Sequence, residues 1–451
     1  MATSDRQTSV AGANTFLDSS SATAHLYETA SGLMPGGTSR IHYHFKPYPI
    51  YARSGLGCVL TDVEGVPRLD FLSNMTSLIH GHANPAIKRA VIDQLERGSA
   101  FSEPAEVEVG LARLMVERVA SVEKIRFSNS GTEAVMFAIK LARAFTGRSK
   151  IAKFEGFYHG YYDSVQVSFN SNESNWGDAD APNSTQSSGG LSDSVAGEVL
   201  TLPYNNRAAV ERLLEKHGNS IAALITDPLS NRAGFAAPEA GFLSFLRDIT
   251  RTYGIVLIFD EVITFRLDYG GAQARYGGEP DLTTFGKIMG GGLPVGAVGG
   301  RSDIMALLDP SDRAPRVISG GTFSGNPLTM AAGLAAMHQM TPAVYDRLNA
   351  LGTRLRDGSN AIFRAAGESA QMTGDGSLFR IITNTRPIAN FRDAILDTAP
   401  PARAAAMHRY LLDEGIIISN SGLGCISTPM GETEVDGFLS ALERTVARLE
   451  K

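Results

Sequence analysis

The sequence predicts an α/β fold: a large domain with a mostly parallel central sheet covered by helices, and a smaller α+β domain built from the N- and C-terminal segments. Between about residues 120 and 260, short apolar segments alternate with helical ones, a pattern typical of parallel strands buried on both faces. After about residue 330 the pattern changes to helices and a final apolar stretch. We therefore expect a large domain over 76–330 and a smaller one from 1–75 and 331–451.

The helices of the first half carry recognisable start and stop signals. The segment 84–98 has Pro85 near its first turn and Gly98 at its end, and Gly147 closes the helix predicted over 134–145. Further helices are predicted over 105–120, 208–216 and 242–253. Strands are predicted over 124–127, 151–154, 221–226 and 255–259. Because ligands gather beyond the carboxyl ends of such strands, residues that directly follow them are candidate site residues.

Composition favours an ordinary soluble enzyme. The chain has 451 residues, of which 43% are apolar and 20% charged, and a net charge of 41 − 47 = −6 that argues against nucleic acid as a partner. Cys58 and Cys425 are the only cysteines, which excludes a disulfide framework and a Cys-x-x-Cys metal site. No window approaches the ~18 apolar residues of a membrane helix. The polar N-terminus does not resemble a signal peptide, so we expect a cytoplasmic protein.

The segment 168–196 is rich in Ser, Asn, Asp and Gly. This composition predicts a long loop, mobile or partly disordered. It contains Trp176, the only tryptophan, which either covers a ligand or makes a surface contact. We favour the surface contact.

Lys287 stands in a glycine-rich stretch, 287 − 260 = 27 residues after Asp260 at the end of an apolar strand. A lysine amine that forms a Schiff base, together with a carboxylate facing a pyridinium nitrogen, is what pyridoxal phosphate (PLP) requires. Asp260 taken alone could equally cap a helix or bind a metal, although only Glu261 is a clear second ligand nearby. The combination of the two residues favours PLP.

Other strand ends carry residues that suit the same cofactor. Ser130, Gly131 and Thr132 lie where a strand meets a helix, and free N–H groups at a helix start bind anions. The alternative is an ordinary helix cap. Tyr158 and His159 follow another strand and could stack on a flat ring or belong to the core. Asp227 ends a third strand, and the turn Gly320 to Phe323 offers hydroxyl and N–H groups to a phosphate.

These segments resemble class III (subgroup II) aminotransferases, PLP enzymes of fold type I. The resemblance runs from about Leu33 and is most specific in SNSGTEAVMFAIKLARAFTGR, FEGFYHGYYDS, the stretch from FDEVITFRLDYGG to FGKIMGGGLPVGAVGGR, and GGTFSGNPLTMAAG. The sequences of these segments are similar to those of the branch that contains glutamate-1-semialdehyde aminomutase, the β-amino acid aminotransferases and amine transaminases.

The resemblance implies a role for each candidate residue. Lys287 would form the Schiff base and then move the proton, and Asp260 would pair with the pyridine nitrogen. Val262 and Tyr158 would pack on opposite ring faces, with His159 and Asp227 nearby. Arg40 would bind a substrate carboxylate, for which a planar guanidinium is suited. The phosphate would be bound by Ser130, Gly131 and Thr132, and by Thr322 of a neighbouring subunit, which implies a homodimer with shared active sites.

The chain departs from the family pattern in two places. Asp227-Pro228 stands where a Glu-Pro pair is usual, which shortens the expected contact near the cofactor. The segment 419–427 lacks both the glutamate of the aminomutases and the arginine of many α-amino acid aminotransferases. With Arg40 as the clear basic candidate, we expect the second specificity pocket to be apolar and to accept an amine or a β-amino acid.

The leading hypothesis is therefore a PLP-dependent aminotransferase that moves an amino group from an amine or a β- or ω-amino acid to an oxo acid or ketone by a ping-pong cycle. The alternative is glutamate-1-semialdehyde 2,1-aminomutase, which transfers the group within one molecule. A catalytically silent PLP- or phosphate-binding module is disfavoured by intact Lys287 and Asp260. A nicotinamide dehydrogenase is disfavoured because the glycines do not form a GxGxxG turn after the first strand.

Overall fold

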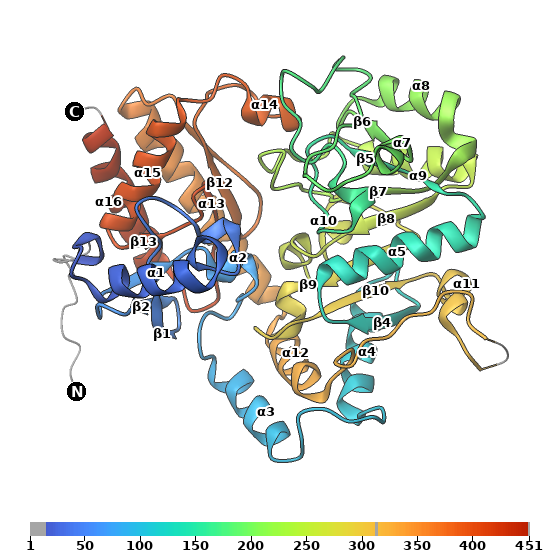
Figure 1. Ribbon diagram of the computed structural model, residues 1–451, viewed down its shortest axis with the longest axis horizontal. Helices are drawn as coiled ribbons and strands as arrows, with labels where there is room; N and C mark the ends of the chain where they lie inside the picture. The colour runs from blue at the N-terminus through green and yellow to red at the C-terminus, as the bar shows by residue number, and fades with distance from the viewer. Residues whose placement is uncertain (1–14, 312–313, 450–451) are drawn as a thin grey trace.

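The computed structural model describes residues 15–311 and 314–449, and its centre is a seven-stranded sheet (Figure 1). Only β10 runs antiparallel to its neighbours, whereas the other adjacent pairs are parallel. The predicted α/β class with a mostly parallel sheet is confirmed. In spatial order the strands are β4 (Lys124–Ser128), β10 (Gly296–Gly300), β9 (Leu282–Gly286), β8 (Val256–Asp260), β7 (Ile221–Thr226), β5 (Lys150–Phe154) and β6 (Val199–Leu202).

Helices cover both faces of this sheet because successive strand residues point to opposite sides. Ala223 and Ile225 of β7 pack with the apolar face of α5 (Gly131–Thr146). Leu224 between them packs instead with α8 (Arg207–His217) and α9 (Phe242–Tyr253). The wholly apolar strands of the sequence therefore reflect burial from two sides.

The first and last parts of the chain meet in a second sheet. There β13 (Ile416–Ile417) pairs in parallel with β3 (Pro67–Asp70), which continues through β2 (Val59–Asp62) to β1 (Ala52–Leu56). A third sheet contains β11 (Gln371–Thr373), β12 (Leu378–Ile382) and β14 (Leu423–Cys425). Figure 1 shows these segments together on the left and the large sheet on the right. The arrangement supports the division 1–75, 76–330 and 331–451, which we keep as a proposal, and residues 1–14 lie outside the described residues.

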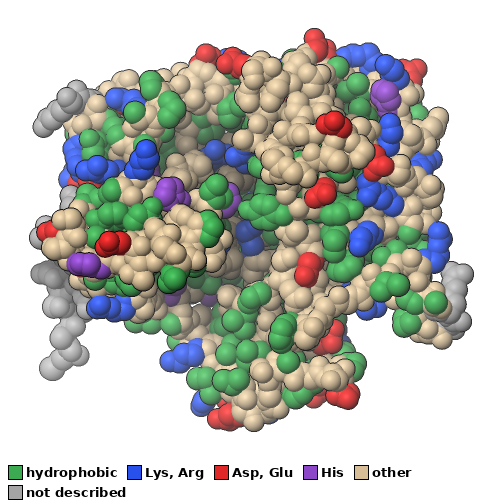
Figure 2. All heavy atoms as spheres, viewed as in Figure 1, with side chains coloured by type: hydrophobic (Ala, Val, Ile, Leu, Met, Phe, Trp, Pro, Cys, Tyr) green, Lys and Arg blue, Asp and Glu red, His purple; other side chains and the backbone are tan. Residues whose placement is uncertain are grey.

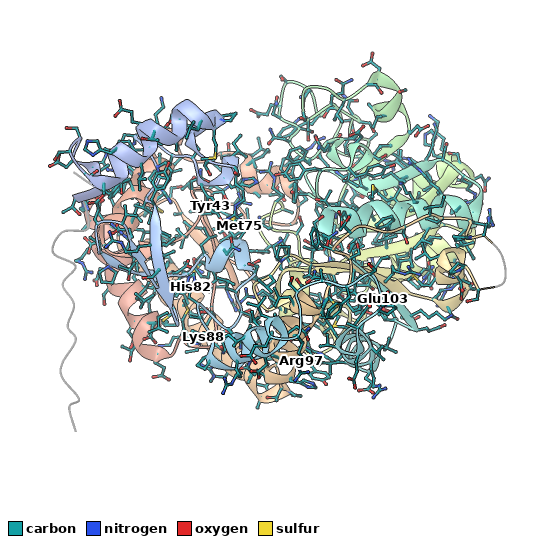
Figure 3. All side chains as sticks on the ribbon, turned by 60° about the horizontal axis from the view of Figure 1, so that its bottom comes forward. Tyr43, Met75, His82, Lys88, Arg97 and Glu103 are labelled. Carbon is teal, nitrogen blue, oxygen red and sulfur yellow. The ribbon has the colours of Figure 1, made fainter. Side chains whose placement is uncertain are left out.

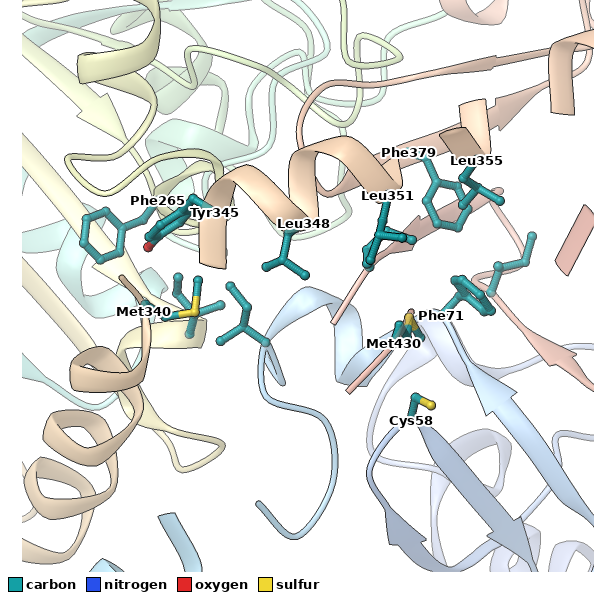
Figure 4. Packing of buried hydrophobic residues seen from close by; sticks show 14 of the residues in the cluster. Cys58, Phe71, Phe265, Met340, Tyr345, Leu348, Leu351, Leu355, Phe379 and Met430 are labelled. Atoms are coloured by element: carbon teal, nitrogen blue, oxygen red, sulfur yellow. The ribbon is translucent and has the colours of Figure 1, made fainter. Parts of the chain in front are cut away.

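A continuous apolar core joins the two lobes. The helix α13 (Pro342–Ala365) carries Tyr345, Leu348, Leu351 and Leu355 on one face, at helical spacing, and all four are buried. They pack between Phe265, beside the large sheet, and Phe71 and Phe379 of the smaller lobe (Figure 4). Burying each such side chain contributes about 1.5–3 kcal/mol, so the lobes are held together by their shared core.

The remaining helices mostly match their predicted positions. The helices predicted over 84–98 and 105–120 are α3 (Pro85–Leu95) and α4 (Glu106–Arg118). The helix predicted over 134–145 begins earlier, at Gly131, because Ser130 caps it. The other long helices are α1 (Ala22–Leu33), α12 (Pro327–Gln339), α15 (Pro401–Asp413) and α16 (Glu432–Leu449). None of the helices in the described residues is long and apolar enough to span a bilayer. Both cysteines are free and buried.

The serine- and asparagine-rich segment 168–196 is a long loop, apart from the short helix α7 (Asp193–Gly197) at its end. Ser168 anchors it, because its N–H and hydroxyl bind the carbonyl groups of Thr185 and Asn183. The favoured surface role of Trp176 is wrong. Its side chain is buried, only 9% exposed, and lies 4.6 Å from the Arg392 guanidinium. It therefore packs between the loop and the smaller lobe and does not line the central pocket.

Candidate active site

A pocket of about 410 Å³ opens at the carboxyl ends of the parallel strands, the edge at which such sheets bind ligands. The ends of β4, β5, β7, β8 and β9 place candidate residues there, because the chain leaves each strand at this edge. All but one of the predicted residues line the pocket: Arg40, Ser130, Gly131, Thr132, Tyr158, His159, Asp227, Asp260, Val262 and Lys287. Residues scattered over nearly 250 positions of sequence thus share one cavity.

Asp260 is the last residue of β8, and three donors fix its carboxylate. His159 Nδ1 lies 2.8 Å from Oδ2, while the Thr284 hydroxyl and the Val262 N–H bind Oδ1 at 3.0 and 3.1 Å. Because a carboxylate only accepts hydrogen bonds, His159 Nδ1 carries the proton. Burial lowers the pKa of His159, against the opposing effect of Asp260. His159 therefore orients Asp260 and is not a stacking ring.

Lys287 directly follows β9 and is surrounded by glycines. Its φ of 47° lies in the left-handed region, which is strained for a residue with a side chain. Burial lowers the pKa of its amine, while the negative charges of Asp260 and Asp227 oppose the shift. A lowered pKa favours the neutral amine, the form that acts as a nucleophile and as a base.

The start of α5 forms an anion cradle at the pocket wall. The Ser130 hydroxyl accepts the N–H of Glu133 at 3.1 Å, and the carboxylate of Glu133 accepts the N–H of Asn129 at 2.6 Å. The N–H groups of the first helical turn have no partners within the helix, and the helix dipole favours an anion there. The capped helix start that was the alternative interpretation is therefore present, and it lines the pocket as well.

Two glycines make room at this cradle. A Cβ on Gly131 would lie 2.9 Å from Val262 Cγ2, so only glycine lets the helix start approach Val262. Gly160 has φ +90°, and a Cβ there would lie 2.6 Å from the hydroxyl of Thr132. The sequence analysis had not singled out Gly160, although it follows Tyr158 and His159 directly.

Tyr158 lines the pocket, and its ring contacts those of Tyr161 and Phe169 at 5.7 and 5.9 Å. Val262 lines the pocket beside Gly131 and Gly286. Whether these two side chains face opposite sides of a bound ring stays a prediction.

Asp227 follows β7 and is buried beside Asp260. Burial and the negative charge of Asp260 raise the pKa of Asp227 well above its ordinary value. Its Oδ1 accepts the N–H of Leu229 at 3.1 Å. Of these two carboxyl groups, Asp260 has the more hydrogen-bond donors and is therefore the better partner for a cationic ring nitrogen.

Arg40 reaches the pocket from the N-terminal segment. Its guanidinium stacks on Tyr43 at 4.0 Å and donates to Asn74 Oδ1 at 2.9 Å, and the Tyr43 hydroxyl donates to the same oxygen at 2.8 Å. Asn74 lies in α2 (Ser73–Thr76), where all four residues have positive φ. This strained left-handed turn also brings Met75 to the pocket; Figure 3 labels Tyr43 and Met75 between the lobes. No sequence signal had indicated it.

A second hollow of about 480 Å³ adjoins the pocket and shares Arg40, Asn74 and Gly292 with it. Most of its lining is apolar, but Asp70 and His82 also face it and pair at 2.8 Å. The expectation of an apolar second pocket is therefore met only in part.

Thr322 is exposed and does not line the pocket of its own chain. Its neighbour Phe323 is also exposed. The predicted contact of Thr322 involves a second subunit, so it stays a prediction.

The sequence analysis missed several residues near the pocket. Thr284 could have been found, because in the parallel pairing of β8 with β9 it lies opposite Asp260. Arg232 and Arg380 were also missed, since each is far in sequence from the motifs. Arg232 contacts Phe169, the neighbour of Tyr158, and Arg380 reaches Asn231 from the smaller lobe.

Comparison with known proteins identifies the family. The model of the class III aminotransferases matches residues 42–431. The chain belongs to the class III aminotransferase family. It is 40% identical to glutamate-1-semialdehyde 2,1-aminomutase 2 of Geobacillus kaustophilus, over 94% of this chain and 97% of the relative.

Two solved transaminase structures are similar to this chain over nearly its whole length. An omega-transaminase from Sphaerobacter thermophilus is 48% identical with a TM-score of 0.94, over 97% of this chain and all of that one. A β-phenylalanine aminotransferase from Variovorax paradoxus is 32% identical with a TM-score of 0.87, over 97% and 96% of the two chains. The protein is an aminotransferase with the PLP fold type I architecture.

Class III aminotransferases use PLP, and the pocket of this family member fits the cofactor. One cavity is surrounded by a buried amine, by a carboxylate that three donors hold, and by a helix start free of side-chain bulk. These groups match the aldehyde, the ring nitrogen and the phosphate of PLP in turn.

Proposed function

We propose that this aminotransferase moves an amino group from an amine or a β- or ω-amino acid to an oxo acid or ketone, in two half-reactions of a ping-pong cycle. The observation that carries the cofactor roles is the meeting of Lys287, Asp260 and the start of α5 in one pocket. The substrate class is supported by Arg40 at the rim and by the largely apolar hollow behind it. The similarity to a solved omega-transaminase and to a solved β-phenylalanine aminotransferase agrees with this substrate class.

The residues of the chain have distinct parts in this proposal. When bound, PLP supplies an aldehyde that bonds to amino groups and a protonated ring that takes up electrons. Asp260 keeps the ring nitrogen protonated, and His159 and Thr284 hold Asp260 in place. Lys287 holds the cofactor and then, as a neutral buried amine, moves a proton between carbon atoms, a task worth typically about 10²–10⁴-fold in rate. Arg40 orients a substrate carboxylate.

Replacing Lys287 tests the assignment directly. Lys287→Ala should abolish multiple-turnover transamination and the visible absorption of covalently held cofactor. The exposed lysine Lys88, on the surface of α3, supplies a matched control. Lys88→Ala should behave as the parent. Full activity of Lys287→Ala would overturn the role of this lysine.

The substrate class is tested with 1-phenylethylamine, an amine without a carboxylate. The purified holoenzyme should convert its cofactor to the amino form, seen as a change in visible absorption, without any acceptor present. If the spectrum does not change while β-phenylalanine does react, the donors are restricted to those that Arg40 can hold.

A second candidate function is intramolecular transfer, as in the aminomutases. The 40% identity to a glutamate-1-semialdehyde aminomutase over nearly the whole chain favours it. The lack of a carboxylate in 419–427 opposes it. Turnover of glutamate-1-semialdehyde without an added amino acceptor would decide for the mutase.

We also propose a homodimer with shared active sites, in which Thr322 contacts the cofactor phosphate of the partner. Sedimentation of the holoenzyme should give a dimer or a multiple of it. Thr322→Ala should weaken cofactor retention without changing the secondary structure.

A further inference from the structure

Two arginines beside the active site have no carboxylate partner. Neither Arg232 nor Arg380 forms an ion pair with an acidic side chain in the described parts of the chain; their guanidinium groups donate to carbonyl and amide oxygens instead. Other partly buried arginines do have an acidic partner, as Arg392 has in Glu155 at 2.7 Å. Cations that are partly buried without a counter-charge are costly unless an anion joins them.

The two guanidinium groups are brought together by the backbone. Arg380 lies in β12 opposite Leu423, and it donates to the carbonyl groups of Ser421 and Asn231. Arg232 follows Asn231 directly. Arg380 therefore reaches into the 419–427 segment, where the sequence itself has no arginine, from the neighbouring strand.

The residues that hold Arg232 lie on the side of the cofactor pocket. Arg232 donates to Asn170 Oδ1 at 2.8 Å and to the Phe169 carbonyl at 3.2 Å, and its guanidinium lies 5.7 Å from the Phe169 ring. Its Nε is buried and has no hydrogen-bond partner among the residues that the structure describes. Because the Phe169 ring contacts Tyr158, Arg232 is separated from the cofactor pocket by one aromatic layer.

The hollows of the structure connect the two arginines to Arg40. Ser419 and Asn420 line both the hollow beside Arg40 and a further hollow of about 250 Å³ that Arg380 lines. Figure 2 shows basic and histidine side chains within the depression between the lobes. The hollow that Arg40 lines therefore adjoins the hollow that Arg380 lines, at Ser419 and Asn420.

Positive charge accumulates around these two hollows. Burial lowers the pKa of Arg380 to about 10, and the charge of Arg232 adds to the effect. Burial lowers the pKa of His42, and Arg232 and Arg40 lower it further. Among the described residues that line the hollow of Arg380 none is acidic, and in the adjoining hollow Asp70 is paired with His82, so the cluster favours an added negative charge.

We propose that Arg232 and Arg380 bind one carboxylate of a dicarboxylic oxo-acid acceptor, with Arg40 facing the other. This inference rests on the proposed aminotransferase function and names its acceptor class. Guanidinium groups bind carboxylates through paired, charge-assisted hydrogen bonds. Donor amines without a carboxylate do not use this site, so the two half-reactions differ in their need for the arginines.

The experiment measures binding of glutarate, an unreactive dicarboxylate, to the holoenzyme by calorimetry, with butyrate as the monocarboxylate of similar size. Glutarate should bind more tightly than butyrate. Arg232→Gln and Arg380→Gln should each weaken glutarate binding by about tenfold or more and leave butyrate binding unchanged. The exposed Arg89, 76% accessible at its side chain, supplies the control, and Arg89→Gln should match the parent.

Kinetics give a second measure. In the arginine variants, KM for 2-oxoglutarate should increase at least tenfold more than KM for pyruvate increases. The half-reaction with 1-phenylethylamine should keep its rate. If Arg380→Gln does not fold, Arg380→Lys and Arg232→Gln provide the test, and circular dichroism verifies their folds.

Equal binding of glutarate and butyrate by the parent, or unchanged glutarate binding in the arginine variants, would overturn the proposal. Because glutarate does not react, binding is measurable even if transamination fails. A failure of the proposed function is therefore distinguished from a failure of this site.

Discussion

His159 Nδ1 lies 2.8 Å from Asp260 Oδ2, and both side chains are buried at the floor of the pocket. Burial lowers the pKa of the imidazole, which favours its neutral form. It therefore orients the carboxylate without neutralising it, which leaves the charge of Asp260 available to a ring nitrogen.

Asp260→Asn should lower kcat by about 100-fold or more, because an amide cannot hold the ring nitrogen protonated and electrostatic stabilisation of this kind is a large catalytic term. Cofactor binding should persist through the phosphate contacts. Steady-state kinetics and cofactor content measure the two effects. A variant that keeps parental kcat would remove Asp260 from the mechanism.

His159→Phe should lower kcat by about tenfold, the effect of losing one hydrogen bond to a charged group. The ring volume is kept, so folding should be little affected. His159→Asn, whose amide can donate to Asp260, should recover part of the activity. No recovery in a stable His159→Asn would mean that the ring acts through packing.

Gly131→Ala should weaken cofactor binding, because its Cβ would lie 2.9 and 3.0 Å from the two methyl groups of Val262. Titration of the apoprotein with PLP measures the change. Val262→Ala removes both methyl groups, so the double variant should bind PLP more tightly than Gly131→Ala alone. Absence of this rescue would place the conflict elsewhere.

The burial of Lys153 predicts that the stability of the fold depends on pH. This lysine is wholly buried in β5, donates to the carbonyl groups of Phe154 and Val167, and has a pKa lowered by burial from 10.5 to about 7. The unfolded chain therefore binds more protons than the folded one between about pH 7 and 10.5, so the free energy of unfolding rises with pH there, by on the order of a few kcal/mol. This contribution is complete above about pH 10.5 and is fully lost once the pH has fallen below about 7.

Melting curves of the holoenzyme between pH 7 and 9.5 check this effect. Lys153→Met should show a smaller rise in Tm over that range than the parent. Parallel curves for the two proteins would show that Lys153 stays charged in the fold.

Asn74→Ala should raise KM for carboxylate-bearing donors about tenfold, because Arg40 and Tyr43 both donate to its side-chain oxygen. Activity toward 1-phenylethylamine should not fall. Equal losses for both donor types would indicate damage to the left-handed turn and not to substrate orientation. Ser77→Ala, which removes the two hydrogen bonds between Ser77 and Asn74 but not those from Arg40 and Tyr43, is the control.

The sequence predicted those parts of the fold and site that local patterns encode. The strands ending at Thr226 and Asp260 are wholly apolar because both faces are covered, so their ends, and the residues there, could be located. The strand β10 (Gly296–Gly300) was missed because it consists of glycines, alanine and valine and has the composition of a loop.

The rest depended on tertiary contacts. Nothing local indicates that Ser73–Thr76 adopts a left-handed turn, or that Trp176 is buried against Arg392. Arg232 and Arg380 became neighbours only through the packing of the smaller lobe on the loops of the larger one. The contact of Arg380 with Asn231 spans 149 positions and that of Arg392 with Trp176 spans 216, and no window of sequence contains them.

The approach of Arg40 from the N-terminal segment has an evolutionary consequence. The residues that face the cofactor leave the ends of one rigid sheet, whereas Arg40, Tyr43 and Asn74 come from the 38–76 region. Mutations in that region can alter which molecules are admitted while the catalytic groups keep their positions. Relatives with one chemistry and many substrates can arise in this way, and a library confined to residues 38–76 is the economical route to new specificities.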